Sequence, residues 1–230
     1  RRGEHVLRPS NPHTPSIHRF LTALRAAGFD GASEPVAVEA DGRERLVFIP
    51  GEVPVPPYPA WFQSDAVLAS IADLLRRFHE ASRAFDPTGE TWSDELADPV
   101  GGAIVVHADV CPENVVFRDG VAVGLLDFDF AAPGRPVYDL AAMVRMCGPI
   151  DDESSAGRLG WAPVDQPARL RLVADAYGLG GSGRGELLEA RDEHAAGAQR
   201  VVARLEAAVL HAVPQLLAQR QPLGEVSQRV

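Results

Sequence analysis

The sequence predicts an α+β protein made of a small mixed N-terminal part and a mainly helical C-terminal part. In the first 50 residues, short β-branched runs flank one amphipathic stretch, whereas beyond residue 60 most apolar residues recur at helical spacing. The segment between the two parts is rich in Pro and Gly, which is typical of a connector. We therefore expect a partial N-terminal lobe in residues 1–50, a connector in 51–60 and a C-terminal lobe in 61–230.

The N-terminal part is predicted to contain a strand, a helix and a hairpin. The strand covers residues 4–9. The helix follows Thr14-Pro15, read as an N-cap residue and a proline in the first turn, and it ends at Gly28. The hairpin spans residues 35–49, because Asp41-Gly42 is a preferred turn pair between two β-branched runs.

Beyond the connector, the sequence predicts helices interrupted by a strand and a second hairpin. Apolar residues at helical spacing cover 65–84, and a buried strand covers 103–106. The hairpin spans 115–126, with Asp119-Gly120 as its turn. From Pro136 onward the pattern is helical, with later helices expected over 165–178 and 186–214.

The segment around this second hairpin carries most of the chemical information. Asp109 precedes Asn114 by five positions, and Asn114 precedes Asp127 by thirteen, with the hairpin between them. Phosphoryl transfer depends mainly on positioning and on neutralising charge, so few side chains suffice. One carboxylate can orient the nucleophile, while an Asn oxygen and a second carboxylate hold Mg²⁺. The spacing therefore predicts a phosphoryl-transfer site.

These residues also resemble a known family. The run His107-x-Asp109-x-x-x-x-Asn114, then Asp127-Phe128, then a Gly-x-Pro-x-x-Asp segment ending at Asp139, is similar to the aminoglycoside phosphotransferase/choline kinase family of the protein-kinase-like superfamily. Weaker resemblance extends to residues 46–52 and 75–81. The resemblance implies a two-lobed protein-kinase-like fold with a truncated small N-terminal lobe. It also implies an ATP-dependent kinase, with GTP as an alternative to ATP, that acts on a hydroxyl of a small molecule.

The resemblance assigns a role to each matching residue. Asp109 would be the catalytic base that orients the acceptor hydroxyl, and Asn114 and Asp127 would ligate Mg²⁺. His107 would brace the catalytic loop by hydrogen bonding, and Asp139 would hold the backbone of that loop. The last two residues are therefore interpreted as structural support of the site.

The nucleotide side departs from the usual pattern. Kinase-like folds reach the phosphates with a strand Lys that pairs with a helical Glu. Here Arg8 stands where the Lys is expected, and His18 or Arg19 stands where the Glu would fall. Arg8 is therefore either a phosphate contact or an ordinary cation at a strand end, and the usual ion pair is absent or rebuilt.

The expected hinge offers a second nucleotide contact. Backbone N–H and C=O groups of Phe48, Ile49 and Gly51 would face the adenine edge, a contact that depends little on side-chain identity. The Gly-rich hairpin of kinase-like folds would lie before residue 5. Because the chain begins with Arg1 rather than Met, we expect further residues upstream.

The composition of the chain limits the classes of partner that it is expected to bind. The net charge of −10 argues against binding to nucleic acid or to an anionic membrane. The negative charge fits a cationic acceptor, although acidic residues on a solvated helix face would account for this charge as well. No apolar run reaches the roughly 20 residues of a membrane span. The two cysteines, Cys111 and Cys147, lack disulfide-framework and metal-ligand spacing, so the expected location is cytoplasmic.

Two further interpretations of the sequence remain beside the small-molecule kinase. A catalytically weak or inactive kinase-fold protein that binds a nucleotide or a partner is motivated by the departures at Arg8 and His18. A metal-dependent phosphohydrolase would use His107, Asp109 and Asp127 with Asp129. It lacks a His-x-His or His-Asp pair elsewhere in the chain to complete its metal centre.

Overall fold

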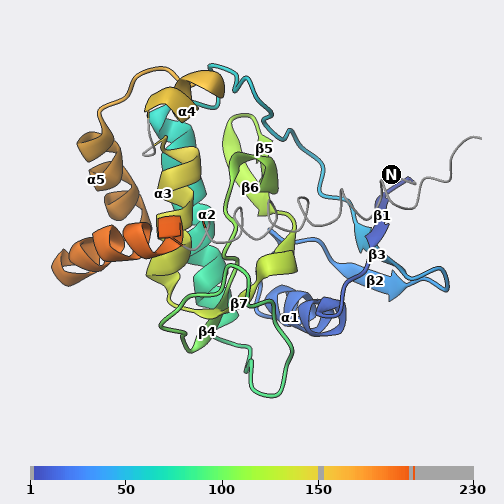
Figure 1. The fold of residues 1–230 in the computed structure, drawn as a ribbon. Helices are drawn as coiled ribbons and strands as arrows, with labels where there is room; N and C mark the ends of the chain where they lie inside the picture. Colours follow the sequence, from blue (N-terminus) through green and yellow to red (C-terminus); the bar gives the residue numbers. More distant parts are fainter. Residues whose placement is uncertain (1–2, 150–152, 197–198, 200–230) are drawn as a thin grey trace, which may run out of the picture.

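The N-terminal part is a three-stranded antiparallel sheet with a helix beside it. The structure is a computed structural model that describes residues 3–149, 153–196 and 199. The sheet has the order β1-β3-β2, and its elements are β1 (His5–Pro9), α1 (Thr14–Ala26), β2 (Pro35–Val38) and β3 (Arg43–Val47). This sheet and α1 lie on one side of the molecule, and α3 and α5 lie on the other (Figure 1).

Helix α1 begins one residue earlier than the sequence predicts. Thr14 is its first residue rather than its cap, and His13 occupies the cap position. The Thr14 hydroxyl accepts a hydrogen bond from the backbone N–H of Asn11 at 2.9 Å instead of capping the helix. Pro15 still lies in the first turn, where its missing N–H costs nothing.

Helix α2 (Asp65–Ser82) is the centre of the larger part. Ser64 caps it by accepting a hydrogen bond from the backbone N–H of Val67. Its buried apolar face packs against α1, α3, α5, β4 and β6. The face consists of Val67, Leu68, Ile71, Ala72, Leu74, Leu75 and Phe78. Burial of this stripe fixes the helix as the support on which the polar loops rest.

Two short antiparallel pairs carry the polar segment that the sequence singled out. Strands β4 (Ile104–Val106) and β7 (Ala132–Gly134) form one pair, and β5 (Val115–Arg118) and β6 (Val121–Leu125) form the other. The loop 107–114 joins the pairs, and residues 126–131 return from β6 to β7. The β5–β6 hairpin lies between the N-terminal sheet and the helices in Figure 1.

The remaining described residues are mainly helical. Helices α3 (Pro136–Cys147), α4 (Glu153–Arg158) and α5 (Gln166–Tyr177) follow the hairpins, and residues 181–196 are also helical. The predicted helix 186–214 is therefore present over 186–196 and at residue 199, and its other residues lie outside the described ones. The predicted order, a small sheet followed by a helical part, is confirmed. The lobe boundaries at residues 50 and 60 stay a prediction.

Aromatic packing fixes the segment that contains Asp127. The Phe128 ring packs edge-to-face on Phe20 of α1 and Phe78 of α2, with ring centroids 6.3 and 5.9 Å apart. It also lies 4.6 Å from the imidazole of His107, measured between ring centroids. Edge-to-face pairs of this kind contribute about 0.5–1.5 kcal/mol beyond their buried area. Phe128 thus anchors its neighbour Asp127 between the two parts of the molecule.

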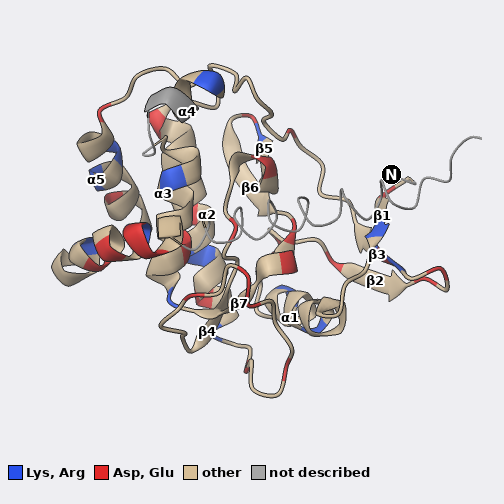
Figure 2. Cartoon of the chain, viewed as in Figure 1, with Lys and Arg blue, Asp and Glu red and all other residues tan. Residues whose placement is uncertain are grey.

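The surface charges are distributed over many elements. The basic residues, all of them Arg, are scattered over the sheet and several helices rather than gathered on one of them (Figure 2). Within the described residues, no helix combines the length and the apolar character that crossing a bilayer would take. The expected absence of a nucleic-acid partner stays a prediction.

Candidate functional site

The β5–β6 hairpin brings Asn114 and Asp127 to the same end. Val115 pairs with Leu125, and the backbone N–H of Leu126 donates to the carbonyl oxygen of Asn114 at 2.8 Å. Asn114 therefore lies immediately before the first strand of the pair, and Asp127 lies just after the second. Both residues line one cavity of about 340 Å³. The hairpin register is what converts a separation of thirteen residues in sequence into proximity in space.

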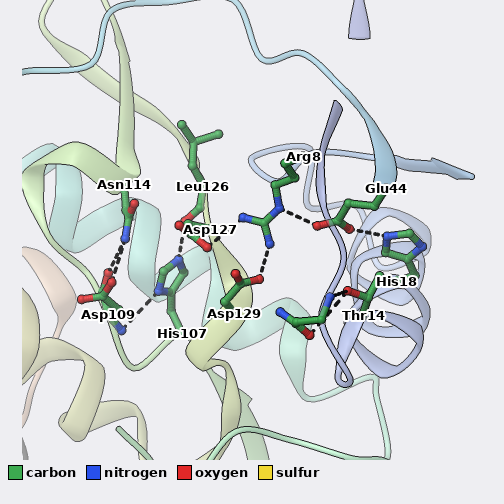
Figure 3. A network of polar contacts seen from close by, with 11 residues as sticks. Arg8, Thr14, His18, Glu44, His107, Asp109, Asn114, Leu126, Asp127 and Asp129 are labelled. Atoms are coloured by element: carbon green, nitrogen blue, oxygen red, sulfur yellow. Dashed lines mark hydrogen bonds and ion pairs between the residues drawn. The ribbon is translucent and has the colours of Figure 1, made fainter. Parts of the chain in front are cut away.

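Asp109 is joined to this pair through Asn114. The Asn114 amide Nδ2 donates to both the carbonyl oxygen and the carboxylate Oδ2 of Asp109, each at 3.0 Å. This commits the Asn114 nitrogen and leaves its side-chain oxygen for another ligand. Figure 3 shows the two side chains facing one another. Asp109 itself does not line the cavity, so it stands beside it, behind Asn114.

The environment raises the pKa of the Asp109 carboxyl above its usual value. Burial is the largest cause, because it penalises the charged form, and the nearby charge of Asp127 adds to it. The electrostatic interaction with His107 and the hydrogen bond from Asn114 oppose the shift without cancelling it. A carboxyl with a raised pKa next to a second carboxylate is a common arrangement for proton transfer.

His107 uses its hydrogen-bonding groups to hold the loop. Its Nε2 donates to the carbonyl oxygen of Leu126 at 2.7 Å, so Nδ1 is left as an acceptor, and the backbone N–H of Asp109 lies 3.3 Å from it. The side chain is completely buried. His107 thus ties the loop that carries Asp109 to the residue immediately before Asp127, and no ring nitrogen remains for chemistry.

Asp139, in the first turn of α3, supports the same loop from below. Its carboxylate accepts hydrogen bonds from the backbone N–H groups of His107 at 2.7 Å and Ala108 at 2.6 Å. His79 Nε2 lies 3.0 Å from the same carboxylate. Burial alone would raise its pKa, but the hydrogen bond and charge of His79, with the loop N–H groups, hold the pKa of Asp139 below its usual value.

Ala108 shows why this loop needs support. Its φ of 65° lies in the left-handed region, which costs a non-glycine residue about 1–2 kcal/mol. The family that the motif resembles usually has glycine at this position. Here the Ala108 peptide is held at both ends, by Asp139 on its N–H and by His194 Nε2, which donates to its carbonyl oxygen at 3.2 Å. The strained backbone is therefore fixed by two buried side chains.

Arg8 forms the ion-pair network on the other side of the cavity. Its Nε donates to Glu44 Oε1, its Nη1 donates to Asp127 Oδ1 at 2.8 Å, and its Nη2 donates to Asp129 Oδ1. Glu44 Oε2 in turn lies 2.6 Å from His18 Nε2. Figure 3 shows the guanidinium between Glu44 on one side and the two aspartates on the other. Arg8 therefore has an ion-pair partner, and that partner is a strand residue rather than the helical Glu of kinase-like folds.

The predicted hinge residues line the same cavity. Phe48, Ile49 and Gly51 contribute to its wall together with Arg8, Asn114 and Asp127. Further lining residues include Ile17, Leu21, Leu46, Val116 and Leu125, so most of the wall is apolar. A mainly apolar cavity with a few convergent polar groups at one end is typical of a site for a small organic ligand.

Gly51 is expected to be intolerant of a side chain. A Cβ at this position would lie 2.5 Å from the carbonyl oxygen of Phe117, the oxygen that accepts a hydrogen bond from Glu52 N–H at 2.8 Å. Replacing Gly51 by Ala is expected to lower the free energy of unfolding by about 1–3 kcal/mol, measured by urea denaturation. The matched control is Gly185→Ala in an open helical position, which should be neutral or stabilising. Equal stability of Gly51→Ala and the native chain would contradict the prediction.

The donor atoms at the cavity fit Mg²⁺. The free oxygen of Asn114 and the half-exposed carboxylate of Asp127 are hard oxygen ligands, which Mg²⁺ prefers when it is shared with phosphates and water. Among the described residues, no group of three or more His, Cys, Asp or Glu side chains is arranged to hold a metal. That finding gives no support to the phosphohydrolase interpretation, which requires such a centre.

Two comparisons connect the chain with known proteins. Residues 90–173 match the Phosphotransferase enzyme family. The chain is 34% identical over 195 residues to the trifolitoxin immunity protein of Rhizobium leguminosarum bv. trifolii. The aligned region covers 82% of this chain and 73% of that protein. The chain belongs to the phosphotransferase enzyme family. It is also 32% identical over 140 residues to a homoserine kinase of Methylobacterium nodulans, covering 60% of this chain but only 37% of that enzyme.

Solved structures extend the comparison to the fold of this phosphotransferase. The structure of APH(2'')-IIa in complex with gentamicin matches 96% of this chain and 86% of that chain, with a TM-score of 0.60 and 15% identity. The ADP-bound aminoglycoside phosphotransferase APH(2'')-Ib matches 87% of this chain and 80% of that chain, with a TM-score of 0.56 and 14% identity. The predicted protein-kinase-like fold is confirmed.

Sequence reasoning missed Glu44 and passed over Asp129 and His79. Glu44 is a buried acid in a strand, and it lies directly opposite Arg8 across the β1–β3 pairing. The sequence alone favours neither a site role nor a surface role for Asp129, and it indicates no more than a core position for His79. The available signal for Glu44 was an acidic residue at an alternating position between Arg43 and Arg45, which by itself points to no partner.

Proposed function

We propose that this phosphotransferase is an ATP-dependent kinase that moves the γ-phosphoryl group to a hydroxyl of a small molecule. One observation carries the proposal: the hairpin brings Asn114 and Asp127 to the end of a cavity whose wall also contains the hinge, and Asn114 is hydrogen-bonded to Asp109. The proposed nucleotide site and a carboxylate with a raised pKa are therefore neighbours, joined through Asn114. This combination supports phosphoryl transfer over the other readings of the motif.

In this proposal, each part of the site has one task. The backbone at Phe48, Ile49 and Gly51 binds the adenine edge, with GTP as the alternative nucleotide. Asn114 and Asp127 hold Mg²⁺, which when bound neutralises phosphate charge. Asp109 accepts the proton of the acceptor hydroxyl as its oxygen attacks, and its raised pKa brings the carboxylate closer in proton affinity to that task.

Arg8 completes the charge balance in the proposed site. Its guanidinium lies at the cavity wall and pairs with Asp127 and Asp129. Arg offers a planar fork of donors that matches phosphate oxygens as well as it matches carboxylates. We propose that its terminal nitrogens contact the nucleotide phosphates, the role that a strand Lys has in kinase-like folds.

The relatives suggest which acceptors to test. Homoserine is a hydroxy amino acid, and aminoglycosides such as gentamicin carry both hydroxyl and amino groups. Both carry hydroxyl and amino groups, and the polycationic aminoglycosides also fit the negative charge of this chain. The relative named a trifolitoxin immunity protein adds that toxin as a further candidate.

The proposed activity is tested by ADP formation. The protein is incubated with ATP and Mg²⁺ and with homoserine, aminoglycosides, macrolides or trifolitoxin, and ADP release above the acceptor-free rate is measured. Removal of Mg²⁺ by chelation should abolish the signal, and the product should carry one phosphate by mass spectrometry. Absence of any nucleotide-dependent change in melting temperature, with ATP or with GTP, would contradict both the kinase and the nucleotide-binding interpretations.

A second candidate is a kinase-fold protein that binds nucleotide without transferring phosphate. The observation in its favour is that Arg8 engages both Asp127 and Asp129, so the proposed metal ligand is already paired with a cation. This candidate predicts a Mg²⁺-dependent thermal shift with ATP and no ADP release with any acceptor. The kinase proposal predicts both signals.

A further inference from the structure

Glu44 is a buried carboxylate whose two oxygens have different partners. Oε1 accepts from Arg8 Nε, and Oε2 lies 2.6 Å from Nε2 of His18 on α1. The Glu44 side chain is only 2% exposed, whereas those of Asp127 and Asp129 are 47% and 37% exposed. A buried charge is tolerated when its lone pairs are satisfied, as they are here. Glu44 is therefore fixed, while the two aspartates remain in contact with solvent.

Because of this difference, the Nε of Arg8 has a buried partner, whereas its two terminal nitrogens have solvent-exposed partners. Nε is held inside by Glu44, and the terminal Nη1 and Nη2 reach Asp127 and Asp129 at the cavity. Solvated carboxylates can exchange their partner at little cost, since water replaces the lost contact. An anion entering the cavity can therefore compete for the two terminal nitrogens without disturbing the bond between Nε and Glu44.

The ion pair is set by the sheet rather than by the helix. Arg8 and Glu44 are directly opposite each other across the antiparallel strands β1 and β3. Helix α1 contains no acidic residue; His18 braces Glu44, and Arg19 pairs with Glu90. Cross-strand neighbours are held by the ladder itself, so the pair exists before any ligand binds. This differs from a strand–helix pair, which depends on the position of the helix.

We propose that Glu44 is a positioning residue for the nucleotide phosphates, acting through Arg8. It holds the guanidinium by Nε so that Nη1 and Nη2 point toward the end of the cavity where Asn114 and Asp127 lie. The inference rests on the proposed function, because it assumes that phosphates occupy that end. It assigns the acidic member of the rebuilt ion pair to β3 and makes His18 its brace.

Nucleotide binding to Glu44→Gln tests this assignment. The variant keeps the shape of the side chain but removes its charge, so Arg8 Nε loses its charged inner partner. Affinity for ATP with Mg²⁺, measured by calorimetry, is expected to fall by about 10- to 100-fold, while affinity for adenosine stays within about twofold. Glu39→Gln is the matched control, because Glu39, just after β2, pairs with Arg45 of β3 at 2.9 Å but has a side chain that is 37% exposed. It should change neither affinity.

Three further measurements separate positioning from structural support. Glu44→Asp, which keeps the charge on a shorter side chain, should recover part of the lost ATP affinity. In an Arg8→Ala background, Glu44→Gln should have no additional effect, since its influence runs through Arg8. If Glu44→Gln does not fold by circular dichroism, His18→Gln provides the same selective loss of ATP affinity in a milder form.

The possible outcomes are distinct. Unchanged ATP affinity in Glu44→Gln, an equal loss for ATP and adenosine, or a full additional loss in the Arg8→Ala background would each overturn the assignment while leaving the kinase proposal intact. Failure of the native protein to bind ATP or GTP with Mg²⁺ would instead overturn the proposed function, and the role of Glu44 with it.

Discussion

Replacing Asp109 by Asn is expected to lower kcat for phosphoryl transfer by about 10²- to 10⁴-fold while ATP affinity stays within about twofold. The substitution removes the carboxylate that accepts the hydroxyl proton in the proposed mechanism. It preserves the size of the side chain and the hydrogen bond from Asn114 Nδ2 to the carbonyl oxygen of residue 109. Since residue 109 does not line the cavity in which ATP is proposed to bind, the binding of ATP should not depend on its charge.

The pH dependence of the rate provides an independent measure of the same group. A base must be deprotonated to act, and burial raises the pKa of Asp109 above the ordinary value of 3.8. The rate constant kcat/KM should therefore rise with pH through an apparent pKa above 3.8 and then level off. Because the folded state binds this proton more tightly than the unfolded state, the stability that Asp109 contributes is present at low pH and is lost as pH rises through the raised pKa.

The comparison variant is Asp119→Asn, at the turn of the β5–β6 hairpin that follows the loop of Asp109. Asp119 is exposed and has a left-handed φ of 51°, a conformation that Asn also tolerates. Its kcat should stay within about twofold of the native value, since surface changes of this kind act weakly. If Asp109→Asn retained a comparable rate, or kept the rising limb of the pH profile, Asp109 would not be the base.

The part of the site that the sequence predicts is the part that is local in the chain. His107, Asp109 and Asn114 belong to one loop, and their spacing already places them within reach of one another. Asp127 follows because an Asp-Gly turn specifies a tight hairpin, which brings its two ends together. The fold class is predictable for a similar reason, since periodicity and the Pro/Gly connector are read from neighbouring residues.

The part that the sequence does not predict depends on strand register and on packing between distant segments. Glu44 faces Arg8 only because β1 and β3 pair in one register, and a shift by one residue would turn Glu44 to the other face. His79 meets Asp139 through the packing of α2 against α3, which no local pattern specifies. The missed cap of α1 is a smaller case, in which Thr14 binds a preceding backbone group instead of a following one.

The largest expected loss of stability is that of Asp139→Ala. The carboxylate is fully buried and has hydrogen-bonding partners in His79 and in the backbone N–H groups of His107 and Ala108. Its removal leaves two buried donors and an imidazole without their acceptor, and the strained backbone at Ala108 without its clamp. The free energy of unfolding at neutral pH should fall by about 3–5 kcal/mol, measured by urea denaturation. Asp139→Asn should lose less, because its amide oxygen can still accept from one N–H.

The difference in the free energy of unfolding between the native protein and Asp139→Ala should depend on pH in a defined direction. Because the pKa of Asp139 is lowered in the folded state, its contribution is fully present above the ordinary value of 3.8 and is lost as pH falls through the lowered pKa. The native protein and Asp139→Ala should therefore converge in stability at strongly acidic pH.

Asp73→Ala on the exposed face of α2 is the control for removing a paired carboxylate. Asp73 pairs with Arg76 at 2.6 Å and Arg77 at 3.1 Å, but its side chain is 46% exposed. Exposed pairs of this kind contribute less than about 1 kcal/mol. A loss for Asp139→Ala no greater than that of Asp73→Ala would contradict the prediction. A larger loss would show that the hydrogen bonds of this buried carboxylate to the loop 107–114 stabilise the fold more than an exposed ion pair does.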